Sequence, residues 1–216
     1  KKALSGKEEE AKHALLLSMA LDKNVIDRTD FEVLQPAIDY YQNHGTATDK
    51  LRTHYYEGRI YQNAGQGDLA MKSFIKAREV EGPITDTLTL GNLLVAQATY
   101  YYSTYKVKEF IANNQQAARL YEAIGHSYYQ FRSLLNTLDG SILNNDKPLA
   151  DSILTCCRSE IEKHPDYEAS LLSYILSYTI TFGSDEEIRT AIESCLDKKN
   201  LSRNAKLKMA LGYSKI

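Results

Sequence analysis

The stretch that decides the fold is Leu51–Ile84, which reads LRTHYYEGRIYQNAGQGDLAMKSFIKAREVEGPI. Its centre holds the helix-breaking sequence NAG at 63–65 and the turn QGD at 66–68, and apolar residues recur at helical spacing on both sides. Gly58 and Ala70 are small, so the two flanking helices can cross closely. The stretch therefore predicts an antiparallel pair of helices.

Larger residues complete this pair. Tyr61, Phe74 and Ala77 lie at helical spacing, so they fill the space between the pair and its neighbours. Asp68 is placed to cap the second helix, and Pro83 follows where that helix should stop. One pair of this length cannot bury its apolar faces alone, so we expect further pairs to stack against it.

Weaker copies of the pattern lie on both sides. A first series of small or apolar residues recurs at Ala37, Ala70, Ala117, Ala150 and Ile188. The longest step in this series is the one from Ala70 to Ala117. Aromatic or aliphatic residues follow four positions later at Tyr41, Phe74, Tyr121, Leu154 and Ile192. A third series lies seven positions after the first, at His44, Ala77, Ile124, Cys157 and Cys195. The spacings predict helix pairs at residues 6–45, 48–82, 86–125, 127–163 and 166–197, with 201–216 starting a further helix.

The chain-wide pattern predicts an all-α fold, because the period-two alternation of strands never persists beyond a few residues. We expect helices at 6–22, 30–43, 48–63, 67–80, 86–110, 113–124, 127–143, 147–162, 166–182, 185–196 and 201–215. Pro36 should kink its helix or set the true start near Leu34. Pro148 suits a helix start, and Ser184 with Glu187 suits a capping box.

The stretch Leu51–Ile84 resembles the tetratricopeptide repeat (TPR) in length and pattern, with departures at His54, where Trp is common, and at Glu57, where Leu is common. The matching consensus positions are Gly58, Tyr61, Ala70, Phe74 and Ala77. The resemblance implies a right-handed α-solenoid of antiparallel helix hairpins that forms a single domain over residues 1–216. It also implies an interaction module that binds a protein or peptide in its concave groove.

Residues Ser18–Glu81 further resemble the opening of a family of TPR-containing bacterial cell-envelope proteins. Proteins of that family typically carry a lipoprotein or secretion signal before the TPR array. The resemblance implies that the chain is the sensor or scaffold array of such a protein and that it lies in the periplasm. TPR families share no catalytic residues, and the peptide clamp of some members has no match here.

Composition argues against several classes of protein. The 216 residues include 26 Lys and Arg against 28 Asp and Glu, a net charge of -2, which disfavours a nucleic-acid binder or a polybasic membrane-surface protein. No segment has the roughly 18–20 consecutive apolar residues of a membrane helix. The chain begins without Met, and the helix at Leu201–Ile216 has an apolar face without a later partner, so we expect a piece of a longer protein.

No catalytic or metal motif is present in the sequence. The five histidines are scattered, and there is no HExxH, CxxC or Gly-rich phosphate loop. Adjacent Cys156 and Cys157 point about 100° apart on a helix, so they cannot easily share one ion. Cys157 and Cys195 stand where Ala77 stands in the clearest copy, which favours a packing role. We therefore expect no enzyme, no metal and no cofactor.

The 16 tyrosines leave two interpretations open. They can fill the core in place of Phe and Trp, or some can line the inner surface, where an amphipathic ring suits the recognition of a peptide or a glycan. Under the second interpretation, the candidate contact residues are Tyr55, Arg59, Gln62, Asn92, Gln97, Tyr102 and Lys106. A sensor domain for a small molecule or glycan is the alternative function if the tyrosines gather in a deep pocket.

Overall fold

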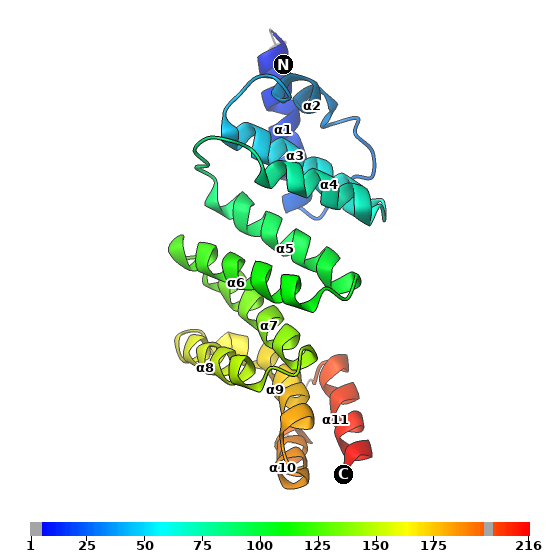
Figure 1. Cartoon of the computed structure of the whole chain (residues 1–216), viewed down its shortest axis with the longest axis vertical. Helices are drawn as coiled ribbons and strands as arrows, with labels where there is room; N and C mark the ends of the chain where they lie inside the picture. The colour runs from blue at the N-terminus through cyan, green and yellow to red at the C-terminus, as the bar shows by residue number, and fades with distance from the viewer. Residues whose placement is uncertain (1–5, 197–200) are drawn as a thin grey trace. The chain divides into compact units, whose positions relative to one another are not determined.

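A computed structural model describes residues 6–196 and 201–216, and all regular structure in these ranges is helical. The chain divides into two compact units, Lys1–Thr104 and Tyr105–Ile216. The first unit contains α1 (Lys7–Lys23), α2 (Gln35–Tyr41), α3 (Ala47–Asn63), α4 (Gly67–Arg78) and α5 (Thr87–Ser103). The second contains α6 (Val107–Ala123), α7 (Ser127–Leu143), α8 (Lys147–Lys163), the 3-10 turn η1 (Pro165–Tyr167), α9 (Glu168–Phe182), α10 (Asp185–Leu196) and α11 (Arg203–Lys215) (Figure 1). The prediction of an all-α fold is confirmed.

The helices recur at equal intervals along the sequence. Helices α1, α3, α5 and α7 begin at Lys7, Ala47, Thr87 and Ser127, and each has 17 residues. The second residue after each of these helices has φ between 55° and 73°: Val25, Gly65, Tyr105 and Asn145. The starts of α6 at Val107 and of α8 at Lys147 are separated by the same number of residues as the starts of α5 and α7. This interval is longer than the stretch Leu51–Ile84, which has the length of one TPR.

One predicted helix is wrong. The sequence predicts a single helix over 86–110, but α5 ends at Ser103 and α6 begins at Val107. The hydroxyls of Ser103 and Thr104 both donate to the Tyr100 carbonyl, at 2.8 and 2.9 Å, and Tyr105 then takes a φ of 58°. These contacts end the helix without the glycine or proline that sequence reasoning looks for.

Several predicted helix ends are confirmed. Pro36 lies in the first turn of α2, whose N-cap is Leu34, and Pro148 lies in the first turn of α8. The Ser184 N–H donates to Glu187 Oε2 at 2.7 Å, and the Glu187 N–H donates to Ser184 Oγ at 3.3 Å, which forms the expected capping box.

The predicted cap at Asp68 is wrong. Helix α4 begins at Gly67 and has no side-chain cap. Asp68 Oδ1 instead accepts a hydrogen bond of 2.7 Å from the Tyr100 hydroxyl of α5. The Asp68 carboxylate therefore joins α4 to α5, a contact that sequence spacing alone does not reveal.

The core of the first unit follows the predicted repeat positions. Gly58 of α3 lies against Phe74 of α4, while Ala70, Phe74 and Ala77 are each 1–3% exposed. Across the chain, the first two predicted series are buried at every position: Ala37, Tyr41, Ala70, Phe74, Ala117, Tyr121, Ala150, Leu154, Ile188 and Ile192. In the third series, the prediction of a packed residue is wrong at His44 and Ile124. Both are exposed, because each follows the end of its helix.

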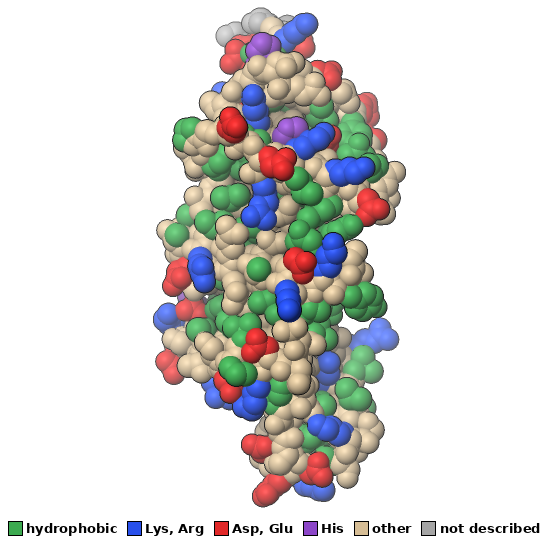
Figure 2. All heavy atoms as spheres, in the orientation of Figure 1, with side chains coloured by type: hydrophobic (Ala, Val, Ile, Leu, Met, Phe, Trp, Pro, Cys, Tyr) green, Lys and Arg blue, Asp and Glu red, His purple; other side chains and the backbone are tan. Residues whose placement is uncertain are grey.

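The second unit has two apolar clusters. Phe131, Leu135 and Leu138 of α7 pack with α8 and the start of α9, and Ile188 and Ile192 of α10 pack with α9 and α11. Consecutive helices thus pack against each other within the unit. Over the face that Figure 2 shows, basic and acidic side chains are interspersed and neither sign forms a continuous patch. Within the described ranges, the helices lack the length and apolar content of a membrane span.

Candidate interaction surface

Two of the predicted contact residues lie in the core of the first unit. Tyr55 is 5% exposed, and its ring packs against Tyr56 and Phe74 at centroid distances of 4.8 and 6.1 Å. Gln97 is 1% exposed, and its Oε1 accepts a hydrogen bond of 3.2 Å from Arg78 Nη1. The structure therefore places both residues away from a ligand-accessible surface.

Arg59 and Gln62 take part in a structural contact between helices. Arg59 Nε donates to Asp22 Oδ1 at 3.0 Å, and Arg59 Nη1 donates to Gln62 Oε1 at 2.5 Å. Burial alone would lower the pKa of Arg59, but the charges of Tyr55 and Asp22 outweigh it and raise the pKa. The guanidinium thus stays charged and links α3 to the end of α1.

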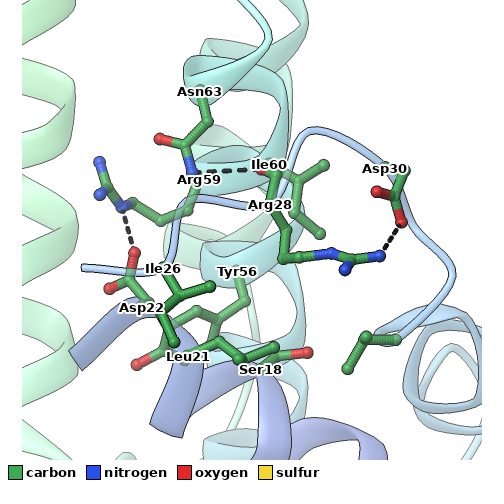
Figure 3. Close-up of a pocket in the computed structure, with 11 residues that line it drawn as sticks. Ser18, Leu21, Asp22, Ile26, Arg28, Asp30, Tyr56, Arg59, Ile60 and Asn63 are labelled. Atoms are coloured by element: carbon green, nitrogen blue, oxygen red, sulfur yellow. Dashed lines mark hydrogen bonds and ion pairs between the residues drawn. The ribbon is translucent and has the colours of Figure 1, made fainter. Parts of the chain in front are cut away.

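A hollow beside Arg59 is formed by α1, α3 and the segment that joins α1 to α2 (Figure 3). Asn63 Nδ2 donates to the Arg28 carbonyl at 3.2 Å, and Arg28 Nη2 donates to Asp30 at 2.7 Å. The volume of the hollow is about 20 Å³, which is room for about one water molecule. These contacts therefore hold the connecting segment against α3 and do not form a ligand site.

The remaining predicted residues do not belong to one unit. Asn92 is half-buried in α5, and Tyr102 is 49% exposed in the last turn of that helix. Lys106 is the exposed N-cap of α6 and belongs to the second unit. Tyr61, which the sequence predicts as a packing position of the repeat and not as a contact residue, is half-buried and packs against Phe31, with ring centroids 5.0 Å apart.

The second unit contains a groove of about 380 Å³ between α6 and α8, with α7 as its floor. This volume lies within the range of roughly 300–1,000 Å³ that is usual for ligand sites. Ala118, Leu134 and Ile153 give the groove an apolar base, and Cys156 is exposed in it. Its polar lining comes from Gln115, Arg119, Glu122, Gln130, Thr155, Ser159 and Glu160. We call this surface the α6–α8 groove.

Four long polar side chains of the groove make no side-chain hydrogen bond or ion pair within the described residues. They are Gln115, Arg119 and Glu122 on α6 and Gln130 on α7. Glu160, in contrast, accepts from Lys163 Nζ at 2.7 Å. Sequence reasoning did not select these residues, because no motif marks them and only the packing of three helices brings them together.

A second groove of about 520 Å³ lies between α8 and α10, with α9 as its floor. Lys147 Nζ donates to Asp151 Oδ2 and to the Tyr178 hydroxyl, each at 2.9 Å, and that hydroxyl donates to Asp151. The hydrogen bonds to Tyr178 and Asp151 raise the pKa of Lys147. Because these three polar groups satisfy one another, they are less available to a ligand than those of the α6–α8 groove.

Residues 6–196 and 201–216 contain no group of three or more His, Cys, Asp or Glu side chains arranged to hold a metal ion. A comparison with protein-family models, curated proteins and solved structures finds no match. The α6–α8 groove, with its unpaired polar side chains, is therefore the strongest candidate interaction surface among the described residues.

Proposed function

We propose that the chain is a non-catalytic scaffold that binds a peptide segment of a partner protein in the α6–α8 groove. In this proposal the helix pairs form a right-handed solenoid of TPR-like hairpins. The recurrence of 17-residue helices at equal intervals supports a repeat architecture. The sequence resemblance extends the proposal to the sensor or scaffold array of a bacterial cell-envelope protein.

One observation carries the proposal: unpaired polar side chains surround an apolar base. Gln115 and Gln130 each offer two amide donors and one acceptor, which suits the N–H and C=O groups of a peptide backbone. Arg119 offers a planar set of donors that binds carbonyl or carboxylate oxygens. Ala118 and Ile153 supply the apolar contact that excludes water beneath such hydrogen bonds.

The test is selection of binders from a library of random peptides displayed on phage, with the purified chain as bait. Isothermal titration calorimetry of selected synthetic peptides then gives Kd for the parent and for Arg119→Ala and Gln130→Ala. We expect each change to raise Kd about tenfold, because each removes hydrogen bonds from a central contact. Arg132→Ala is the matched control, since Arg132 is exposed on α7 but does not line the groove.

Two results would contradict the proposal. Failure to select any peptide with a measurable Kd would exclude this groove as a peptide site. Selected peptides that lose as much affinity with Arg132→Ala as with Arg119→Ala would place binding elsewhere on the chain. Thermal unfolding of each variant shows whether the fold is kept.

A further inference from the structure

The α6–α8 groove has a neighbour of similar build on the other flank of α8. We call this neighbour the α8–α10 groove, since α8 and α10 are its walls and α9 is its floor. The two floors, α7 and α9, pack against each other, and α8 packs on both of them. Helix α8 is therefore a wall that the two grooves share.

The linings of the two grooves meet on the exposed side of α8. Thr155 and Ser159 line the α6–α8 groove, whereas Arg158 lines the α8–α10 groove, and all three side chains are exposed. Residues three apart on a helix are surface neighbours with Cβ atoms about 5–6 Å apart, so Arg158 lies beside Thr155. Because the hydroxyl side chains at this point are short, a bound chain can pass over α8 from one groove to the other.

Each groove has an arginine without a partner on its first wall. These are Arg119 of α6 in the α6–α8 groove and Arg158 of α8 in the α8–α10 groove. Lys147, which also lines the α8–α10 groove, is held by Asp151 and by the Tyr178 hydroxyl. Arg158, in contrast, makes no side-chain hydrogen bond or ion pair in the part of the chain that the structure describes. Its guanidinium can therefore donate to a ligand, as that of Arg119 can.

The second wall of each groove carries two hydroxyls four residues apart. The pairs are Thr155 with Ser159 on α8 and Thr190 with Ser194 on α10. The hydroxyls of Thr155, Thr190 and Ser194 donate to backbone carbonyls of their own helices at 2.8–2.9 Å. Since each hydroxyl has given its hydrogen, its oxygen is left to accept. From α6 to α10 the surface thus presents an arginine, a pair of hydroxyls, the second arginine and the second pair of hydroxyls.

Each groove also has a carboxylate that can accept a hydrogen bond. Glu122 of α6 and Glu186 of α10 make no side-chain hydrogen bond or ion pair within residues 6–196 and 201–216. Because a free carboxylate matches each free arginine, the two grooves favour neither a strongly acidic nor a strongly basic ligand. They fit a ligand that carries donors and acceptors in turn.

We propose that a single extended segment of the partner occupies both grooves and crosses α8 beside Thr155 and Arg158. An extended backbone has no internal hydrogen bonds and presents N–H and C=O groups along its whole length, which matches the succession of donors and acceptors from α6 to α10. A helical segment pairs these groups internally, so it would leave the arginines and carboxylates of the grooves without partners. The inference rests on the proposed peptide-binding function and adds to it a second groove and the conformation of the peptide.

The two grooves set a lower limit on the length of this segment. Helices that pack directly lie about 8–10 Å apart, and a groove separates α6 from α8 and α8 from α10, so the path from α6 to α10 exceeds about 16–20 Å. An extended chain advances about 3.3 Å per residue. At least about five or six residues are therefore needed to reach both grooves.

The experiment uses the full chain and peptides of about 12 residues that are selected from the random phage library and then synthesised. Isothermal titration calorimetry gives Kd for the parent, for Arg119→Ala and for Arg158→Ala. We expect each change to raise Kd about tenfold. Stepwise truncation of a peptide from one end should abolish the effect of Arg158→Ala first, and truncation from the other end that of Arg119→Ala. Arg189→Ala is the matched control, because Arg189 is exposed on α10 and lines neither groove.

Protection of thiols from iodoacetamide locates the bound peptide independently. Cys156 reports on the α6–α8 groove in the parent chain. Thr190→Cys, made together with Cys156→Ser, places a thiol in the α8–α10 groove, because Thr190 is exposed and lines it. The same peptide at saturation should slow the labelling of both positions about fivefold or more.

Several results would overturn the inference. Selected peptides that need Arg119 but bind Arg158→Ala as tightly as the parent would do so and leave the proposed function intact, as would protection of Cys156 without protection at position 190. Equal losses for Arg189→Ala and Arg158→Ala would show that the α8–α10 groove is not used. Helical carbon chemical shifts of a bound, isotope-labelled peptide would exclude the extended conformation. Peptides that need neither Arg119 nor Arg158 would contradict the proposed function itself.

Discussion

Gly58 of α3 lies so close to Phe74 of α4 that a Cβ at position 58 would stand 2.5 Å from Phe74 Cδ1. Phe74 is 1% exposed, and its ring also packs against Tyr55. The ring therefore has little room to retreat, and the crossing of α3 and α4 depends on the absence of a side chain at position 58.

We expect Gly58→Ala to lower the free energy of unfolding by about 1–3 kcal/mol. The clash with Phe74 outweighs the gain of up to about 1 kcal/mol from replacing a glycine inside a helix. Urea unfolding followed by circular dichroism measures the change. Gly67→Ala is the matched control, because its Cβ would meet Tyr100 at an ordinary distance of 3.4 Å. Unchanged stability of Gly58→Ala would contradict the close crossing.

Val25 is a β-branched residue in the left-handed region, with φ 58° and a side chain 81% exposed. Gly65 occupies the equivalent position after α3. Val25→Gly should therefore raise the free energy of unfolding by about 0.5–1 kcal/mol, since relief of strain exceeds the added entropy of the unfolded chain. The reverse change, Gly65→Val, should lower it by about 1–2 kcal/mol. Thermal unfolding measures both changes. A rise in stability for Val25→Gly with a fall for Gly65→Val would confirm the strain at position 25, and changes of the same sign would contradict it.

The local pattern of the sequence is enough to predict most helices, but not the equal intervals at which the helices begin. Small residues at Gly58 and Ala70 and the capping residue Ser184 mark real features of the fold. The break at Tyr105 escapes the pattern, because hydroxyl contacts and a left-handed φ end α5 where no glycine or proline stands. The predicted step from Ala70 to Ala117 is longer than its neighbours because the two residues are not equivalent: Ala70 is the fourth residue of α4, which begins at Gly67, whereas Ala117 is the eleventh residue of α6, which begins at Val107.

The candidate surface depends on tertiary packing, which periodicity does not determine. Under the interpretation that some tyrosines line the inner surface, Tyr55 should lie on an accessible helix face, yet its neighbours Tyr56 and Phe74 enclose it. Gln115 and Gln130 lie in two different helices of ordinary composition, so their meeting in one groove follows only from how α6 packs on α7.

Asp86 joins α3 to the start of α5. Its carboxylate accepts from the Thr89 N–H at 2.9 Å and from Arg52 Nε at 2.6 Å. Burial alone would raise the pKa of Asp86, but the hydrogen bonds from Thr89 and the charge of Arg52 outweigh it and hold the pKa below its usual value. Its contribution to stability is therefore complete above the unfolded value of about 3.9 and is lost as the pH falls through the folded value.

Asp86→Asn should lower the free energy of unfolding at pH 7 by about 1–3 kcal/mol, because the amide keeps the cap but loses the ion pair. It should also weaken the loss of stability below about pH 4, which urea unfolding at a series of pH values measures. Arg52→Met completes a double-mutant cycle, in which the two changes should not be additive. Full additivity, or an unchanged acid dependence, would contradict the role of the pair.

Adjacent Cys156 and Cys157 should differ sharply in reactivity. Cys156 is exposed in the α6–α8 groove, whereas Cys157 is fully buried and Cys195 is 1% exposed. Burial, with smaller contributions from Cys156 and Glu160, raises the pKa of the Cys157 thiol to about 12. Because the thiolate is the reactive form, iodoacetamide at about pH 8 should label only Cys156 until urea unfolds the chain. Mass spectrometry of tryptic peptides measures the rates, and a peptide selected for the groove should slow labelling of Cys156. Labelling of Cys157 at the same rate in the folded protein would show that α8 does not bury this residue.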